Sequence, residues 1–207
     1  MTGEPKARLI DPLKVHVPNQ VETPILLLKR ASVSMAPALA ATRSESHASL
    51  HPWFHGDMGT EAEEADPDWQ AAQLSKQTQD FEQRNNLTYY AFKEDNLIGM
   101  VALQPVWRRG QMKLTYWIRS NAQRHGYATE AVTAMIAFAF DTLDARLVTT
   151  GHAEPNTASA RLAQKLGFQQ IARQPLACEL PDGTLVAGIA YGLEPHRTHQ
   201  RLPRAEC

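Results

Sequence analysis

The residues best suited to bind an anion form the run from Gln123 to Ala128, which reads Gln-Arg-His-Gly-Tyr-Ala. This run stands between a strand-like segment, 114–118, and an apolar helical pattern that begins at Ala128. The first N–H groups of a helix lack partners within it and lie at the positive end of its dipole, so they can bind a phosphate. Gly126 allows close approach of the backbone, and Arg124 adds a positive charge. Taken alone, the run fits an ordinary strand-to-helix turn equally well.

A second group of candidates lies at the start of the helical pattern over 156–166. Ser159 shares a helix face with apolar side chains, so we expect its hydroxyl to point inward at one end of an apolar stripe. Asn156 is a natural N-cap of this helix. Gly167 fits a left-handed C-cap and Phe168 can fold back on the last turn. Ending the helix is a sufficient structural reason for both Gly167 and Phe168, and we assign them no catalytic role.

Three histidines recur at every fourth position, a spacing that would align their imidazoles along a helix for a metal ion: His47, His51 and His55. Pro52 is expected to interrupt helical continuation here, and no carboxylate shares the spacing. We therefore expect no metal site in this segment and no metal cofactor in the protein.

Composition excludes several classes of protein. The chain has 207 residues, 43% of them hydrophobic and 21% charged, with a formal net charge of −1 that gives no general attraction to nucleic acid. It has two cysteines, Cys178 and Cys207, too few for a disulfide framework. The apolar run 25–28 is too short for a signal peptide or a membrane span. We expect a cytoplasmic protein with neither a nucleic-acid nor a membrane partner.

The elements that must position these groups follow from the periodicity of apolar residues. Residues 1–22 hold early prolines and mixed charge and predict an irregular leader, and 194–207 predict a loose polar tail, so one domain is expected over 23–193. The predicted elements are strands over 25–29, 87–93, 97–105, 113–118, 146–150, 168–173 and 185–193, and helices over 34–45, 67–86, 128–141 and 156–166.

Residues typical of a helix N-terminus precede the helices predicted over 34–45 and 67–86. Ser34 is a candidate N-cap of the first, and Asp66 with Pro67 forms an N-cap and N1 pair for the second. The stretch 56–68 carries six acidic residues and no basic one, and we expect an acidic loop there. The order of elements implies an α/β protein with a mixed sheet. The spaced glycines of a Rossmann fold and the Gly-Lys-Ser/Thr of a P-loop are absent.

From Tyr116 to Phe168 three spaced features agree with one known pattern. Tyr116-Trp117-Ile118 precedes Gln-Arg-His-Gly-Tyr-Ala-Thr-Glu-Ala over 123–131, Asn-Thr-Ala-Ser opens the next helix at 156–159, and Lys-Leu-Gly-Phe closes it at 165–168. The segment resembles the GCN5-related N-acetyltransferase (GNAT) superfamily, in its RimJ/RimL ribosomal-protein branch. Weaker similarity extends from Ile25 to about Leu193.

This resemblance implies the GNAT fold. It is a mixed, mostly antiparallel sheet of about seven strands flanked by helices, splayed at the strands that bear Tyr116 and Val148. It also implies acetyl-CoA as co-substrate, with its pyrophosphate at 123–128. The cofactor-binding residues so implied are Trp117, Ile118, Gln123, Arg124, His125, Gly126, Tyr127, Ala128, Asn156 and Ser159.

The resemblance further implies direct attack of an amine on the thioester, with Ser159 as general acid to the departing thiolate. Backbone N–H groups of the splayed strand would hold the oxyanion. Many relatives carry a glutamate where this chain has Lys113. Glu179 is then the leading base, and a solvated turn carboxylate is an equally good description of it. The resemblance places Trp53, Phe54 and Tyr116 at the acceptor pocket; core packing is the alternative for the first two.

The basicity of the acceptor amine indicates which kind of amine the enzyme would acetylate. Neutralising a lysine amine near pH 7.5 costs roughly 3 to 4 kcal/mol more than neutralising an α-amine, which favours a protein N-terminus, such as that of a ribosomal protein, or another weakly basic amine. A CoA-binding sensor without turnover and an antibiotic-modifying acetyltransferase remain alternatives. Similarity to RimL suggests a homodimer.

Overall fold

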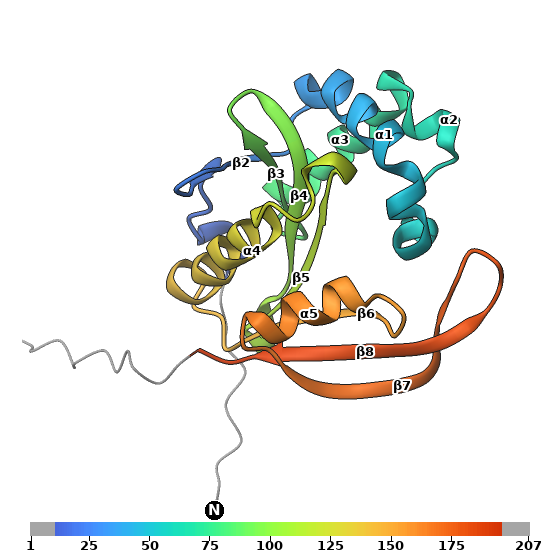
Figure 1. Ribbon diagram of the computed structural model, residues 1–207. Coiled ribbons are helices and arrows are strands. Elements are labelled where there is room, and N and C mark those ends of the chain that lie inside the picture. The colour runs from blue at the N-terminus through green and yellow to red at the C-terminus, as the bar shows by residue number, and fades with distance from the viewer. Residues whose placement is uncertain (1–10, 196–207) are drawn as a thin grey trace, which may run out of the picture.

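The computed structural model of the chain describes residues 11–195, which form one eight-stranded sheet with helices on both faces (Figure 1). The strands lie in the order β1-β2-β3-β4-β5-β6-β8-β7, and every neighbouring pair is antiparallel except β5 and β6. The predicted mixed, mostly antiparallel α/β architecture is confirmed. The strand bounds are β1 Gln20–Glu22, β2 Leu27–Arg30, β3 Leu87–Lys93, β4 Asn96–Val106, β5 Gln111–Ile118, β6 Leu147–Ala153, β7 Gln169–Glu179 and β8 Leu185–Leu193.

Two apolar clusters separate the helices into two layers. One cluster joins α4 and α5 to the sheet, and the other joins α1 and α3 to its opposite face. In Figure 1, α1, α2 and α3 gather at the upper right, whereas α4 and α5 lie over the left and lower parts of the sheet. The helices are α1 Ala36–Phe54, α2 Glu61–Glu64, α3 Pro67–Glu82, α4 Tyr127–Ala137 with a π-helical continuation over Phe138–Thr142, and α5 Thr157–Lys165.

The sheet splays between β5 and β6. These parallel strands pair over only three residues each, and the last pair is Lys113 with Thr149. Beyond that pair β5 continues to Ile118 and β6 to Ala153, so the two strands diverge. The predicted splay at the strands that bear Tyr116 and Val148 is confirmed. Side chains at this gap lose their cross-strand neighbours and become accessible from both faces of the sheet.

The N-terminal segment differs from the irregular leader expected over 1–22. Within its described part, a 3-10 turn covers Pro12–Lys14, and β1 pairs with β2 as the edge strand of the sheet. Because β1 is an additional strand, the sheet has eight strands where about seven were expected. Strand β1 was missed because a three-residue strand is too short to show alternation of apolar and polar residues. Residues 196–207 of the expected tail lie outside the described residues.

Helix α1 is longer than the predicted helix over 34–45. It runs on through Pro52 to Phe54, so the expectation that this proline would interrupt it was wrong. Pro52 lies in the last turn, where the lost hydrogen bond is offset because Leu50 and Phe54 pack into the cluster beneath α1 and α3. Ser34 is not the N-cap but lies in a preceding 3-10 turn, Val33–Met35.

The acidic stretch 56–68 is not simply a loop. It contains α2, which begins with a capping box formed by Thr60 and Glu63. Glu64 is fully buried at the end of α2 and accepts two hydrogen bonds from the guanidinium of Arg43, at 2.6 and 3.0 Å. An acidic run therefore hides one structural carboxylate that composition could not single out.

Three predicted helix boundaries are confirmed. The side chain of Asp66 accepts a hydrogen bond from the N–H of Asp68 at the start of α3, and that of Asn156 accepts one from the N–H of Ser159 at the start of α5. Gly167 has a φ of +84° after α5, and Phe168 is 3% exposed. These are local devices, and their residue types suffice to predict them.

No helix within residues 11–195 combines the length and the hydropathy needed to cross a membrane.

Candidate active site

The hydroxyls of Tyr116 and Ser159 meet at the splay. Tyr116 lies on β5 beyond the last ladder pair with β6, and Ser159 lies in the first turn of α5. The phenol donates a hydrogen bond to the seryl Oγ at 3.3 Å. Burial raises the pKa of Tyr116, against a smaller opposing effect of the bond to Ser159, so the phenol keeps its proton at neutral pH. The predicted inward orientation of Ser159 is confirmed.

Two cavities share this pair of hydroxyls. One, of about 90 Å³, passes through the gap between β5 and β6, and its wall includes Lys113 and His152 as well as Tyr116 and Ser159. The other is a groove of about 380 Å³ that runs from Ser159 along the N-terminus of α4. Trp53 and Phe54 at the end of α1 line both cavities. A long substrate in the groove could therefore present one end at the gap.

The loop 123–126 turns the chain from β5 into α4. Arg124 and Gly126 both have positive φ, 64° and 84°, and Gly126 is the N-cap residue of α4. Among the described residues no side chain caps this helix, so its first N–H groups face the groove without a capping acceptor. Gln123 closes the loop because its amide donates to the carbonyl of Ile118 at 3.2 Å.

The predicted cofactor residues fall into two places in the structure. Most of them line the groove, where an anion would meet the start of α4: Trp117, Ile118, Gln123, Arg124, Gly126, Tyr127, Ala128, Asn156 and Ser159. His125 is exposed and stacks on Tyr127 with ring centroids 5.7 Å apart, and it lines a neighbouring hollow with Lys93 and Arg119. The groove thus offers backbone donors, one guanidinium and an apolar floor, which fit the pyrophosphate and the pantetheine arm of CoA.

A third cavity, of about 390 Å³, opens on the α1 and α3 side of the sheet. It shares Phe54, Lys113 and Thr115 with the cavity at the gap. Its wall is polar and includes Glu64 and Arg43, whose charges offset each other. Although burial opposes ionisation, the hydrogen bonds and the charge of Arg43 keep the pKa of Glu64 below its ordinary value. This cavity therefore opens to the gap from the side of α1 and α3.

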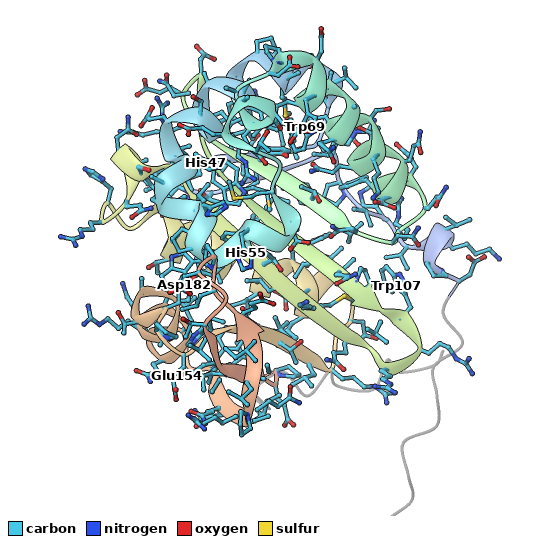
Figure 2. The ribbon with its side chains drawn as sticks, turned by 90° about the vertical axis from the view of Figure 1, so that its right-hand side faces the viewer. His47, His55, Trp69, Trp107, Glu154 and Asp182 are labelled. Carbon is cyan, nitrogen blue, oxygen red and sulfur yellow. The ribbon has the colours of Figure 1, made fainter. Side chains whose placement is uncertain are left out.

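Glu179, the base expected from the sequence, is exposed at the end of β7, next to the turn of the β7–β8 hairpin. It lines neither of the cavities that contain Tyr116 and Ser159. Figure 2 shows Asp182, in the same turn, below the end of α1 that carries His55. In this conformation the carboxylate of Glu179 is apart from the paired hydroxyls, and its catalytic role stays a prediction.

The three histidines spaced by four residues do align. The ring centroids are 5.1 Å apart for His47 and His51 and 6.0 Å apart for His51 and His55. Figure 2 shows His47 on α1 and His55 in the 3-10 turn that follows it. Even so, the described part of the chain holds no group of three or more His, Cys, Asp or Glu side chains arranged to bind a metal.

Sequence reasoning missed two residues at the gap, His152 and Thr115, and did not place Lys113 in the cavity wall. His152 lies on β6 within a sequence that shows no catalytic motif, so no local signal marks it. Thr115 faces the gap only because β6 departs from β5 there. All three positions depend on strand register, which the sequence pattern does not encode.

Comparison with solved structures shows the same fold. RimL, the ribosomal L7/L12 alpha-N-protein acetyltransferase, in complex with coenzyme A, has a TM-score of 0.76 and 16% identity, and the match covers 84% of this chain and 97% of that one. Mycobacterium smegmatis RimJ in complex with a CoA-disulfide has a TM-score of 0.77 and 16% identity, and the match covers 84% of each chain. The microcin C7 self-immunity acetyltransferase MccE, with acetyl-CoA and AMP, has a TM-score of 0.77 and 16% identity, with 86% of this chain and 98% of that one covered.

No curated protein sequence matches this chain significantly. A family model does match. The acetyltransferase (GNAT) domain aligns with residues 26–169, from the residue before β2 to the first residue of β7. That range is more than half of the chain and contains the groove, the splayed strands and both paired hydroxyls. The protein therefore belongs to the GNAT family and is an acetyltransferase.

Proposed function

We propose that this protein transfers the acetyl group of acetyl-CoA to a primary amine, with the protein N-terminus as the favoured acceptor. The observation that carries the proposal is the Tyr116–Ser159 contact at the point where the groove meets the gap. A thioester at that point has a hydroxyl proton beside it and an opening to the opposite face of the sheet. Direct attack then needs no acyl-enzyme.

The donor side rests on the loop 123–126 and the start of α4. We assign the pyrophosphate of CoA to the free N–H groups of α4 and to Arg124, and the pantetheine arm to the groove that leads to Asn156 and Ser159. When bound, acetyl-CoA supplies an activated acyl thioester. The protein supplies its orientation and the exclusion of water.

Ser159 is proposed as the general acid. Because Tyr116 donates to the seryl Oγ, the Ser159 hydroxyl proton is free to point at the departing sulfur. Tyr116 thereby positions the hydroxyl, and its raised pKa keeps it a donor throughout the neutral range. The aromatic side chains of Trp53 and Phe54 would form one wall of the acceptor site.

The acceptor is proposed as an N-terminal amine, such as that of a ribosomal protein, which is the acceptor that the names of the RimL neighbours state for those proteins. The lower pKa of an α-amine supports this choice. We further propose a cytoplasmic location, and a homodimer as the resemblance to RimL suggests. A small-molecule amine is the second candidate acceptor, because MccE, whose name describes a self-immunity acetyltransferase for microcin C7, has the same fold.

The test measures thiol release from acetyl-CoA with four acceptors: a peptide with a free α-amine and no lysine, the same peptide with a blocked N-terminus, the blocked peptide with an internal lysine, and a small primary amine. We expect release with the free α-amine peptide and none with the blocked one. Mass spectrometry locates the added acetyl group.

Two outcomes would change the proposal. Release with the small amine alone would assign a small-molecule acceptor. Binding of CoA by calorimetry without release for any acceptor would identify the rival function, a CoA-binding sensor that does not turn over.

A further inference from the structure

His152 occupies a defined place at the splay. Tyr116 on β5 and His152 on β6 each lie three residues beyond the last ladder pair, Lys113 with Thr149. Met112 and Val148 are also a ladder pair, and alternate residues of a strand point to the same side. Tyr116 and His152 therefore face the same side of the sheet, across the gap from each other. Both line the cavity at the gap, together with Ser159.

The ring of His152 is held in one orientation. It stacks on Tyr191 of β8 with ring centroids 5.5 Å apart and an interplanar angle of 26°. Its Nδ1 lies 2.9 Å from the carbonyl oxygen of Ala153. A carbonyl can only accept, so this hydrogen bond requires the proton on Nδ1, and the neutral ring then carries its lone pair on Nε2.

The Nε2 atom of His152 is buried and has no hydrogen-bond partner within residues 11–195. Buried nitrogen atoms in proteins nearly always have a partner, because an unpaired one costs free energy. The side chain of His152 lines the cavity, and its Nε2 can accept a proton and lacks an intramolecular donor, so it is suited to a donor that arrives with a substrate.

No other described residue in the wall of this cavity can accept the proton of an amine as readily. The wall includes no Asp or Glu, and its Lys113 also lines the polar cavity on the α1 and α3 side of the sheet. The remaining titratable groups around the imidazole are the phenols of Tyr116 and Tyr191. The neighbouring carboxylate, Glu154, is exposed and paired with Arg173 of β7 at 2.8 Å.

We propose that His152 is the general base of this acetyltransferase, accepting the amine proton at Nε2; the proposal rests on the proposed function. The amine nitrogen forms a bond to the carbonyl carbon and gives one proton to Nε2. The carbon–sulfur bond breaks, and the sulfur takes the hydroxyl proton of Ser159. The imidazolium proton then returns to the seryl oxygen by way of Tyr116 or solvent, so the products are an amide and a thiol.

The first test is the pH profile of kcat for the free α-amine peptide at saturating concentration. His152→Asn removes the base while keeping a donor at the place of Nδ1, and we expect a loss of about 10²-fold or more with a flattened acid limb. Exogenous imidazole is expected to restore part of the rate to His152→Ala. His16→Asn is the matched control, since His16 is exposed on the N-terminal segment, and it should leave the profile unchanged.

The pH profile of Glu179→Gln is measured beside that of His152→Asn, because Glu179 is the other candidate for the general base. If that variant loses the acid limb while His152→Asn retains it, the base is Glu179 and the proposal is overturned. Unchanged CoA affinity in His152→Asn, by calorimetry, is expected and separates a chemical role from a collapsed site.

A second test needs no turnover. Nitrogen-15 NMR of the CoA-bound protein is expected to show His152 as the Nδ1–H tautomer, with Nε2 responding to added alaninamide; the His152→Asn spectrum assigns the signal. Protonated Nε2 at neutral pH, or no response to the amine, overturns the proposal. If no acceptor is acetylated and Nε2 still responds, the proposed function fails while the amine-binding place of His152 stands.

Discussion

The hydroxyls of Tyr116 and Ser159 are 43 positions apart in the chain, yet they make the one hydrogen bond that joins β5 to the start of α5 at the splay. At the scale of single residues this pair carries the proposed chemistry, because it holds a protonated phenol against a seryl oxygen and leaves the seryl proton available. Arg124 lines the groove beside the start of α4, and its guanidinium is exposed and can bind an anion.

Ser159→Ala should lower kcat by about 10²-fold with little change in the KM for acetyl-CoA, because only the acid is lost. Steady-state kinetics at saturating peptide measures both constants. Ser75→Ala, an exposed serine of α3, is the matched control and should behave as wild type. An unchanged kcat in Ser159→Ala would return this serine to a packing role.

Arg124→Ala should weaken CoA binding by roughly 10-fold or more, in line with the loss of a charge-assisted hydrogen bond worth about 1.5 kcal/mol, while kcat at saturation persists. Calorimetric titration with CoA gives the affinity. Arg109→Ala removes an exposed arginine beside the β4–β5 turn and should leave the affinity as it is. Equal losses in both variants would point to a general electrostatic effect.

At the scale of elements, the pairing of α1 with α2 shapes the wall of the polar cavity. The Arg43 guanidinium is 11% exposed and lies over the ring of Trp117, 5.3 Å from its centroid, while it binds the fully buried Glu64. Gln70 of α3 adds a hydrogen bond to the same carboxylate at 3.0 Å. Three helices are thus joined through one buried charge pair beside the polar cavity.

Glu64→Gln should destabilise the fold by about 3 kcal/mol, because it leaves the largely buried Arg43 without its counter-charge. Since the folded state lowers the pKa of Glu64, the stabilisation is present above about pH 4 and is lost as acidification protonates the carboxylate. Urea unfolding between pH 3 and 7 should show a flatter pH dependence for the variant. Glu61→Gln, an exposed residue of the same helix, is the control, and an equal loss there would refute this account.

At the scale of the whole molecule, the proposed function assigns the two substrates to different cavities. The groove is lined by α4, α5 and the end of α1, the polar cavity is lined by α1 and α3, and the cavity at the gap between β5 and β6 shares residues with both. Ligand binding at the groove engages β5, α4 and α5 together and should therefore stabilise the folded protein as a unit.

CoA at about 100 times its Kd should stabilise the fold by about 2.7 kcal/mol, which corresponds to a rise in Tm of roughly 5 to 10 °C for a protein of this size. Differential scanning calorimetry gives the shift. Pantetheine at the same concentration lacks the pyrophosphate and should give a smaller rise. Equal shifts for the two compounds would contradict the assignment of the pyrophosphate to the start of α4.

The sequence by itself determined the features that depend on near neighbours in the chain. Gly126 before α4, the caps Asp66 and Asn156, and the αL residue Gly167 are confirmed, because each depends on the backbone conformation or hydrogen bonds of residues a few positions away. The motif around 123–131 indicated the family for the same reason, since the loop and helix form from consecutive residues.

Only the tertiary structure decided what lies beside what. The Tyr116–Ser159 contact, the buried Arg43–Glu64 pair and the cavity position of His152 depend on strand register and on desolvation, which bring together segments that no periodicity relates. For the same reason Pro52 could remain inside α1, where packing outweighs one lost hydrogen bond. The loop and helix of the proposed donor site could therefore be predicted from consecutive residues, whereas the position of His152 at the gap follows only from the folded sheet.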